Sequence, residues 1–448
     1  MLNEGPRPGL AADVVGEPLN SVLSTWVDSL DSKLISILDK IAEAGAGVWL
    51  VGGCVRDAIS MPDSTHDIDL ATTLTPSEMM ELFPRFIDTG SSFGTITLRL
   101  NERPDTDLDV MFEATTLRVE GSYGDGRRPD EVSFGSSLKN DLQRRDFTMN
   151  AIAVDVARRL LHDPFEGRKD LEYGIVRAVG SASDRLGEDG LRIMRAYRFM
   201  DAASRGILVP DESLSIALIE QQHCIKNVSV ERIWAEFRRI LVGIHATVVI
   251  QLMEDDGLLE CILGPNLGSA KHLDVSSFGE ENELDVLRSR LAVIVSPLCE
   301  SDQESRLRDL TVPRNLMRDV VQINKTLSSI PNQDSCQELR LFRTALGNLL
   351  PSNLMALSGR DKVIAGRLRD ALDVLPPLRA GISPLVNGII LGKESGLDSG
   401  IRLGRLKSWL HRCQIEADLE DVSEVLSLLD ELDWQSGNPR DWPQVHWP

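Results

Sequence analysis

The apolar residues of this chain change their spacing near residue 160, and this change limits the folds that the chain can adopt. Before it, residues 67–70, 95–100 and 108–117 alternate apolar and polar side chains, as half-buried strands do. After it, apolar residues recur at helical spacing, most clearly in residues 188–205 and 230–241. The pattern predicts an α+β fold, in which a small head with a mixed sheet precedes an all-helical remainder.

The length of the chain, 448 residues, is more than one ordinary domain needs. We expect a mobile tail at residues 1–20, where Gly, Pro and small residues show no period. The head then covers residues 21–160, a helical neck residues 161–260, a helical body residues 261–380 and a helical tail residues 381–448.

Composition and targeting signals narrow the class of protein. No apolar run approaches the roughly 20 residues of a membrane span, and no basic region followed by an apolar stretch opens the chain. We therefore expect no membrane association and a cytoplasmic protein. The six cysteines lie far apart without a Cys-x-x-Cys pair, so the sequence indicates neither a zinc ribbon nor a disulfide framework.

The formal net charge is −21, which taken over the whole chain argues against a nucleic-acid partner, because Lys and Arg drive phosphate binding. The distribution of the charge is uneven. Between residues 118 and 205, Lys and Arg slightly outnumber Asp and Glu. The positive charge is therefore concentrated in one segment.

A glycine turn stands at the end of the first apolar run of the expected head. Gly52 and Gly53 follow residues 48–51 and precede a helix-like segment, which indicates a strand, a tight turn and a helix start. Two glycines at a helix N-terminus allow phosphate to approach the backbone closely, and Arg56 would add charge. The turn is therefore a candidate phosphate site.

Two acidic residues follow this turn. Asp67 and Asp69 are two apart in an expected strand, so both carboxylates lie on one face. They repel each other unless a cation joins them, and a pair of Mg²⁺ ions uses such carboxylates to activate an attacking hydroxyl and to neutralise a triphosphate leaving group. The alternative is an Asp-x-Asp pattern in a solvated turn, which the upstream glycines disfavour.

A third carboxylate would complete such a metal site. In residues 108–117 the alternation places Asp109, Met111 and Glu113 on the polar face. Either Asp109 or Glu113 can join the two earlier carboxylates, and either can also be an ordinary exposed acid on a strand.

Two further motifs carry polar groups at close spacing. Arg145, Asp146 and Asn150 precede an apolar run; Arg suits phosphate oxygens through forked hydrogen bonds, whereas Asp and Asn suit ribose hydroxyls. Asp189 and Arg192 are three apart at the start of the strongest helical pattern, so they are neighbours on its surface.

The motif with Arg145, Asp146 and Asn150 can also be a salt-bridged helix end. Asp189 and Arg192 can also be an ion pair at a helix N-terminus. As a recognition element, an acceptor beside a forked donor matches the edges of cytosine and adenine, which offer an amino donor beside a ring-nitrogen acceptor. Uracil and guanine reverse that order. One Asp189 and Arg192 pair would therefore accept C and A and reject U and G without a template.

The chain resembles the class II tRNA nucleotidyltransferases (CCA-adding enzymes) and the related bacterial poly(A) polymerases. The resemblance rests on the stretches LVGGCVRDAI, HDIDLATTLTPSEMMELFP, FGTITL, FEATTLRVEGSYGDGRRPDEVSF, DLQRRDFTMNAIAVD, DPFEGRKDLEYGIVRAVG and EDGLRIMRAYRF, which cover residues 46–205 densely. ERIWAEFRRIL at residues 231–241 extends it. It implies a polymerase-beta-like nucleotidyltransferase head, the use of Mg²⁺, and tRNA, CTP and ATP as partners.

The resemblance also implies a role for each matching residue. Metal binding falls to Asp67 and Asp69, and Glu113 in FEATTLR is similar to the family's third acidic position. The other implied residues bind the nucleotide: Gly52, Gly53 and Arg56 the triphosphate, Arg145, Asp146 and Asn150 the ribose and phosphates, and Asp189 with Arg192 the base. Residues 116–130 resemble the flexible element that the family needs for the final A.

The chain departs from the family pattern at some positions. Gly190 stands where the family usually has proline, which could loosen the start of the base-reading helix. No His-Asp pair is present near residues 291–295, so we expect no metal phosphatase domain. Residues 404–416 carry basic side chains around an apolar stripe, and this segment either holds the tRNA elbow or packs on the body as a surface helix.

The predicted function is template-independent addition of CCA to tRNA 3′ ends. The alternatives are an enzyme that adds only CC or only A, a poly(A) polymerase, and a non-catalytic RNA-binding relic of the fold. FGTITL is typical of the CCA type and strongly basic flanks are absent, which disfavours the poly(A) polymerase. The intact Asp67, Asp69 and Arg-Arg-Asp motif disfavour the relic.

Overall fold

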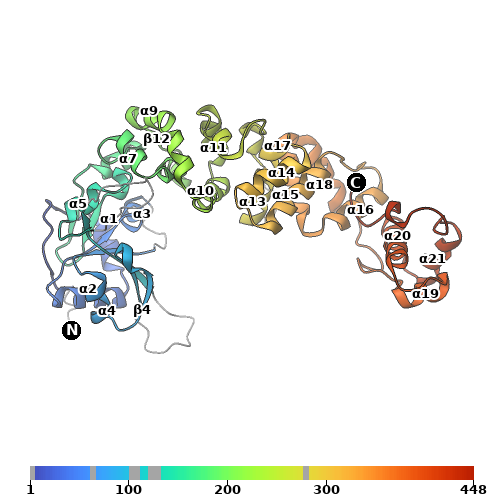
Figure 1. The fold of residues 1–448 in the computed structure, drawn as a ribbon, viewed down its shortest axis with the longest axis horizontal. Helices are drawn as coiled ribbons and strands as arrows, with labels where there is room; N and C mark the ends of the chain where they lie inside the picture. The colour runs from blue at the N-terminus through green and yellow to red at the C-terminus, as the bar shows by residue number, and fades with distance from the viewer. Residues whose placement is uncertain (1–5, 61–66, 100–110, 120–132, 276–281) are drawn as a thin grey trace. The chain divides into compact units, whose positions relative to one another are not determined.

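A computed structural model describes residues 6–60, 67–99, 111–119, 133–275 and 282–448. The chain forms two compact units, one of Met1–His245 with Asp256–Leu258 and one of Ala246–Asp255 with Leu259–Pro448 (Figure 1). The first unit holds the mixed sheet and the second is helical. The predicted α+β class, a head with a mixed sheet before a helical remainder, is confirmed, and the finer division of the helical part stays a prediction.

Among the described residues, eight strands form one sheet in the order β1-β10-β9-β2-β3-β6-β5-β4. The strands are β1 (Glu17–Pro18), β2 (Val48–Val51), β3 (Asp69–Thr72), β4 (Phe86–Gly90), β5 (Thr95–Arg99), β6 (Met111–Thr116), β9 (Ala153–Asp155) and β10 (Leu160–His162). β3 and β6 are parallel, and the other neighbours in this sheet are antiparallel. Two strand pairs lie apart from it: β7 (Arg118–Val119) with β8 (Ser133–Phe134), and β11 (Ile175–Val176) with β12 (Val209–Pro210).

Two of the alternating segments, β5 and β6, are buried on one side of the strand, whereas β3 is buried on both sides after Asp69. In β6 the side chains of Phe112 and Ala114 are buried while Met111 and Glu113 are exposed, as the pattern predicted. Strand β3 begins at Asp69, two residues later than expected, so Asp67 precedes the strand. Asp109 lies outside the described residues, as do residues 120–130 of the flexible loop predicted over residues 116–130.

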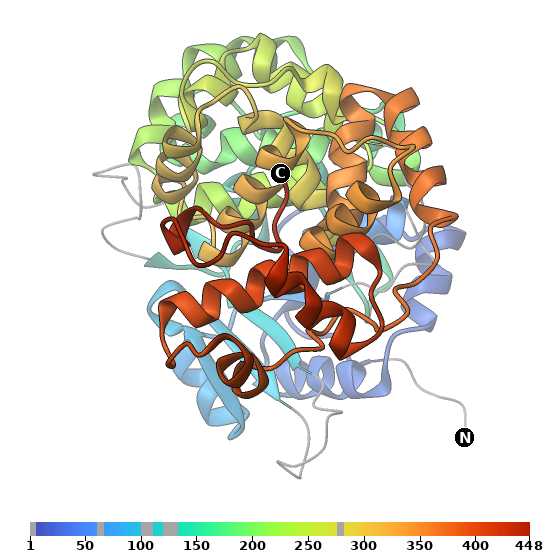
Figure 2. The ribbon, with the colours of Figure 1, turned by 90° about the vertical axis from the view of Figure 1, so that its right-hand side faces the viewer.

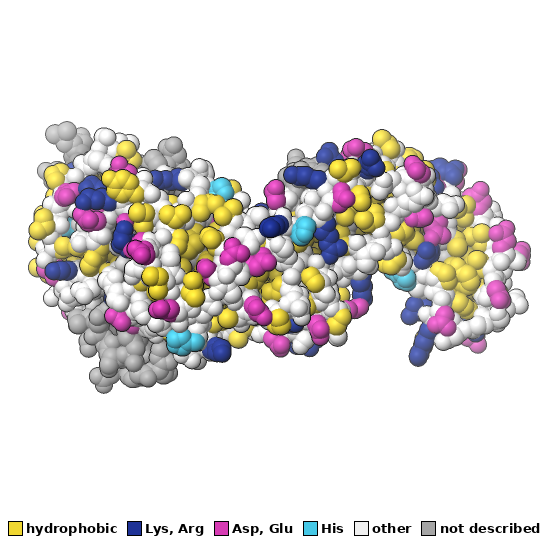
Figure 3. Space-filling view, turned by 90° about the horizontal axis from the view of Figure 1, so that it is seen from above, with side chains coloured by type: hydrophobic (Ala, Val, Ile, Leu, Met, Phe, Trp, Pro, Cys, Tyr) yellow, Lys and Arg dark blue, Asp and Glu magenta, His cyan; other side chains and the backbone are white. Residues whose placement is uncertain are grey.

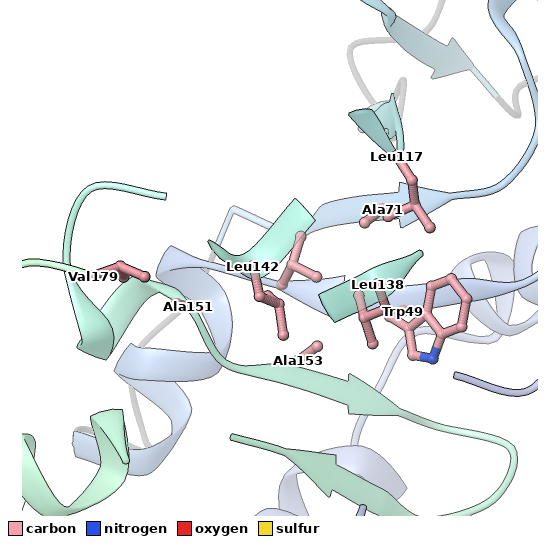
Figure 4. Packing of buried hydrophobic residues seen from close by; sticks show 9 residues of the cluster. Trp49, Ala71, Leu117, Leu138, Leu142, Ala151, Ala153 and Val179 are labelled. Carbon is pink, nitrogen blue, oxygen red and sulfur yellow. The ribbon is translucent and has the colours of Figure 1, made fainter. Parts of the chain in front are cut away.

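The helices of the first unit cover this sheet and continue beyond it (Figure 1). They are α1 (Ser21–Asp28), α2 (Ser32–Glu43), α3 (Gly53–Ser60), α4 (Pro76–Leu82), α5 (Leu138–Gln143), α6 (Gly167–Tyr173), α7 (Ala182–Glu188), α8 (Leu191–Met200), α9 (Glu212–Glu220) and α10 (Val230–Val242). On one face of the sheet, Leu138 and Leu142 of α5 pack against Trp49, Ala71 and Ala153 (Figure 4). Helix α5 thereby fixes the segment that follows it against the sheet.

The helix predicted over residues 188–205 is shorter in the structure. Asp189 has extended backbone angles and its side chain accepts a hydrogen bond from the Leu191 N–H, so α8 begins at Leu191. The helix ends at Met200, because a separate 3₁₀ turn at Ala203–Arg205 follows. Gly206, expected as the stop of the long helix, instead ends this turn with a φ of 94°.

Residues 6–20 are not the detached tail that we expected. The Leu10 N–H donates to the Ala46 carbonyl at 3.1 Å and the Leu19 N–H to the Arg159 carbonyl at 3.1 Å. Strand β1 also pairs with β10 at the edge of the sheet. Backbone pairing of this kind needs no apolar period, so the side-chain pattern carried no sign of it.

The second unit consists of helices: α11 (Ala246–Asp255), α12 (Leu258–Leu263), α13 (Glu283–Val295), α14 (Glu300–Asp309), α15 (Arg314–Leu327), α16 (Cys336–Leu346), α17 (Leu350–Arg360), α18 (Lys362–Asp373), α19 (Gly388–Ser395), α20 (Ile401–Ala417) and α21 (Val422–Ser427). The basic segment 404–416 lies in α20. Its apolar stripe packs against Trp434 and Trp442 through Leu406 and Leu410; the ribbon of this part of the chain is red in Figure 2. Helix α20 also contacts α16, within residues 261–380, which agrees with one of the two predicted roles, and contact of the segment with tRNA stays a prediction.

The surface carries mixed charge. On the face shown in Figure 3, Lys and Arg side chains lie among Asp and Glu side chains rather than in one continuous field. Within the described part of the chain, no helix is both long and apolar enough to cross a lipid bilayer.

Candidate active site

The backbone of the turn between β2 and α3 favours glycine. Gly52 has a φ of +74°, a backbone conformation that L side chains rarely adopt. A Cβ atom there would lie 2.9 Å from Nη1 of Arg145 and 3.9 Å from Oδ2 of Asp69. The Gly52 backbone therefore lies directly beside a guanidinium and a carboxylate, at the N-terminal end of α3, which begins at Gly53.

Asp69 and Glu113 are register partners on the adjacent parallel strands β3 and β6. Partners in register share a face of the sheet, so the two carboxylates are neighbours. Burial raises the pKa of Asp69 to about 6, and the negative charges of Glu113 and Asp67 act in the same direction, whereas Arg145 lowers it. The three predicted carboxylates therefore share one neighbourhood, although Asp67 reaches it from the loop before the strand.

The donors in this neighbourhood fit a divalent cation. Carboxylate oxygens are the ligands that Mg²⁺ prefers in proteins. Three neighbouring carboxylates repel one another, and a cation would add to the positive charge that Arg145 supplies beside Asp69. Within the described residues, however, no three His, Cys, Asp or Glu side chains converge on one point as a formed metal site would require. The fit rests on the chemistry of the donors and on the register of Asp69 with Glu113.

Arg145 is held in place by an acid that the sequence analysis did not identify. Asp141 on α5 is buried and pairs with Arg145 at 3.2 Å and with Arg144. Despite burial, which would raise it, the charges of the two arginines hold the pKa of Asp141 below its usual value. Nε of Arg145 is buried and has no hydrogen-bond partner among the described residues, and Nη1 lies at the Gly52 turn. The i,i+4 spacing of Asp141 and Arg145 was the available signal.

Asp146 and Asn150 form the next part of the site. Asp146 is buried and accepts hydrogen bonds from Nδ2 of Asn150 at 3.0 Å and from Nε of Arg195 at 2.7 Å. Burial would raise its pKa, but the charge of Arg195 and the bond from Asn150 lower it to about 2. Oδ1 of Asn150 in turn accepts from Nη1 of Arg56 at 2.7 Å. Asp146, Asn150 and Arg56 are thus one hydrogen-bonded chain, and their contact with a nucleotide stays a prediction.

An arginine cluster that the sequence analysis missed supports this chain. The guanidinium carbons of Arg56, Arg195 and Arg198 lie 4.9, 5.3 and 4.0 Å from the centroid of the Phe199 ring. Glu236 on α10 is buried and pairs with Arg198 at 2.5 Å and with Arg195 at 3.9 Å. These contacts join α3, α8 and α10, segments too far apart in sequence for a local pattern to reveal them.

Asp189 and Arg192, predicted to act as a pair, are each held by other groups. Oδ2 of Asp189 pairs with Arg232 of α10 at 2.9 Å. Nη1 of Arg192 pairs with Glu188 at 2.6 Å, and its Nη2 donates to the Arg144 carbonyl at 3.0 Å. Helix α8 is thus attached through Arg192 to the segment that carries Arg145, and base reading by Asp189 and Arg192 stays a prediction.

Comparisons with known proteins agree with this arrangement. Residues 48–177 match the family described as the poly A polymerase head domain. Residues 210–270 match the family described as the probable RNA- and SrmB-binding site of polymerase A. The fold and the site thus define a nucleotidyltransferase.

Relatives along nearly the whole chain identify the branch of this class. A CCA-adding enzyme of Geobacillus sp. (strain WCH70) is 31% identical over 395 residues, which is 88% of this chain and 94% of the relative. The structure of the Bacillus stearothermophilus CCA-adding enzyme in complex with CTP has a TM-score of 0.71 at 25% identity, covering 92% of this chain and 98% of that one. The Thermotoga maritima CCA-adding enzyme complexed with tRNA shares the fold, with a TM-score of 0.65 at 19% identity over 93% of this chain and 100% of that one. The chain belongs to the CCA-adding enzyme family.

Proposed function

We propose that this protein adds CCA to the 3′ end of tRNA, taking CTP and ATP as substrates and using no nucleic-acid template. The observation that carries the proposal is the register of Asp69 with Glu113 beside the Gly52 turn and Arg145. Carboxylates beside a phosphate-sized turn are what nucleotidyl transfer requires. Family membership over the length of the chain supports the same activity.

In the proposed reaction the RNA 3′ oxygen forms a bond to the α-phosphorus of the nucleotide and pyrophosphate leaves. Asp69 and Glu113, with Asp67, are the residues that would hold Mg²⁺, which supplies charge neutralisation and activation of the hydroxyl when it is bound. The backbone N–H groups at the start of α3 and the Arg145 guanidinium bind the phosphates.

Base selection belongs to Asp189 and Arg192 in this proposal. An Asp acceptor beside an Arg donor matches the edges of cytosine and adenine and opposes those of uracil and guanine. Because Arg232 and Glu188 already hold the two side chains, their positions are fixed before the nucleotide arrives. A fixed pair discriminates more strongly than a mobile one, because the wrong base cannot reorient it.

The experiment is incubation of the purified protein with tRNA that ends at the discriminator base, with labelled CTP, ATP or both. We expect growth by two nucleotides with CTP alone and by three with both. Growth that stops at two with both nucleotides indicates an enzyme that adds only CC, and long products from ATP alone indicate a poly(A) polymerase. The control is the variant Asp69→Ala, which we expect to add no nucleotide. A wild-type protein that adds no more nucleotides than this variant contradicts the proposal.

A further inference from the structure

Among the described residues, one face of the head sheet is partly exposed over β4, β5 and β6. In β5 the side chains of Ile96 and Leu98 are fully buried on one side, whereas Thr95 and Thr97 lie on the other side and are partly exposed. Thr115 of β6 shares their face, since it is the register partner of Thr95. On the neighbouring strands β2, β3 and β9, α5 packs against Trp49, Ala71 and Ala153 of the same face.

The partly exposed face of β4, β5 and β6 presents threonine hydroxyl groups in pairs. Oγ1 of Thr95 lies 3.1 Å from Oγ1 of Thr115, and Oγ1 of Thr89 lies 3.2 Å from Oγ1 of Thr97. Nη2 of Arg118 donates to Thr95 at 3.2 Å, which brings a positive charge to the same surface. Hydroxyl groups that can both donate and accept, beside a guanidinium, are typical of surfaces that hold a sugar-phosphate backbone without reading its sequence.

The strand register places the threonine hydroxyl groups on the β5 side of Asp69 and Glu113. Asp69 pairs with Glu113, and Glu113 pairs with Thr97, so the three lie on one line across β3, β6 and β5. Strand spacing puts Thr97 about 10 Å from Asp69. The Gly52 turn lies on the opposite side of Asp69, because β2 is the other neighbour of β3.

In nucleotidyl transfer the attacking and leaving oxygens lie on opposite sides of the reacting phosphorus. If the phosphates occupy the Gly52 side, the RNA end must approach from the β6 side, where the hydroxyl surface lies. We propose that Thr95, Thr97 and Thr115 bind the sugar-phosphate backbone of the last nucleotides of the RNA strand that is being extended. This inference rests on the proposed function and adds the RNA subsite to it.

The test is the triple variant Thr95→Val, Thr97→Val, Thr115→Val, because valine keeps the shape and the strand preference of threonine while removing the hydroxyl. The substrate is an RNA hairpin with the single-stranded 3′ end of tRNA and no elbow, so that contacts elsewhere do not mask the effect. The matched control is Thr25→Val, at an exposed threonine of α1 whose hydroxyl donates to the Ser21 carbonyl in its own helix.

We expect KM for the RNA to rise about tenfold in the triple variant, with KM for CTP and kcat within about twofold of the wild type. An unchanged KM for the RNA, or an equal rise in both KM values, overturns the inference. If the triple variant does not fold, Thr97→Val alone decides, with an expected rise of about threefold for RNA only. Failure of the proposed function is distinguishable, since the wild type itself would then not extend the hairpin.

Discussion

The most informative single substitution is Asp146→Asn, which removes a buried charge and keeps the shape of the side chain. Asp146 is 8% exposed and its pKa is lowered from 3.8 to about 2 by Arg195 and Asn150. A depression of this size corresponds to about 2 kcal/mol of folding free energy in the ionised form. We therefore expect the variant to lose about 2 kcal/mol of stability at pH 7, with a higher KM for CTP because Asn150 and Arg56 lose their anchor.

The same pKa predicts how this loss depends on pH. Because the folded-state pKa lies below the unfolded value, the contribution of Asp146 is complete above about pH 5 and is lost as the pH falls toward 2. The difference in unfolding free energy between the wild type and Asp146→Asn should shrink to about 1 kcal/mol at pH 3.

Urea unfolding of both proteins at pH 7 and at pH 3 measures this difference. The control is Asp28→Asn, which removes the exposed Asp28 and Arg159 pair and should leave the stability nearly unchanged. A difference between the wild type and Asp146→Asn that stays constant from pH 7 to pH 3 would refute the account of Asp146 as a buried, ionised anchor.

Other substitutions test the remaining parts of the site. Asp69→Asn should abolish nucleotide incorporation without lowering the melting temperature, because it removes a charge that burial and Glu113 disfavour. A variant that incorporates nucleotides near the wild-type rate contradicts the metal site. Arg192→Ala should narrow the preference for CTP and ATP over UTP and GTP by about tenfold, the size of one unpaired polar group, measured as ratios of catalytic efficiency on one primer. Gly190→Ala should lower the melting temperature, because the added Cβ would lie 2.3 Å from the Cys224 carbonyl oxygen. The control Gly187→Ala should leave the melting temperature unchanged, because the added Cβ would lie in open space. Equal melting temperatures for the two variants contradict the close packing at Gly190.

The local sequence pattern predicted the structure correctly where the structure depends on residues that are close together in the sequence. The alternation in β6 and the glycine turn after β2 were both predicted, because each depends on neighbours in the sequence. The choice between Asp109 and Glu113 was left open, because the pairing of β3 with β6 joins segments more than 40 residues apart. Register with Asp69 now favours Glu113.

The contacts that hold the site residues in place could not be predicted from the sequence either, because they join residues far apart in the chain. Glu236 pairs with arginines of α8, and Arg232 pairs with Asp189, across about 40 residues of chain. Nothing in the local pattern of α10 distinguishes these charges from a solvated helix face. The pairing of Arg192 with Glu188 was detectable in principle, because its i,i+4 spacing is a standard helix contact.

We propose that one site selects C twice and then A without a template. The most direct measurement is sequencing of RNA 3′ ends after tRNA that ends at the discriminator base is incubated with the protein and all four nucleotides at equal concentration. The account predicts that the extended molecules end in CCA and that growth then stops. Runs of A, mixed bases at the added positions, or ends identical to the starting tRNA would contradict it.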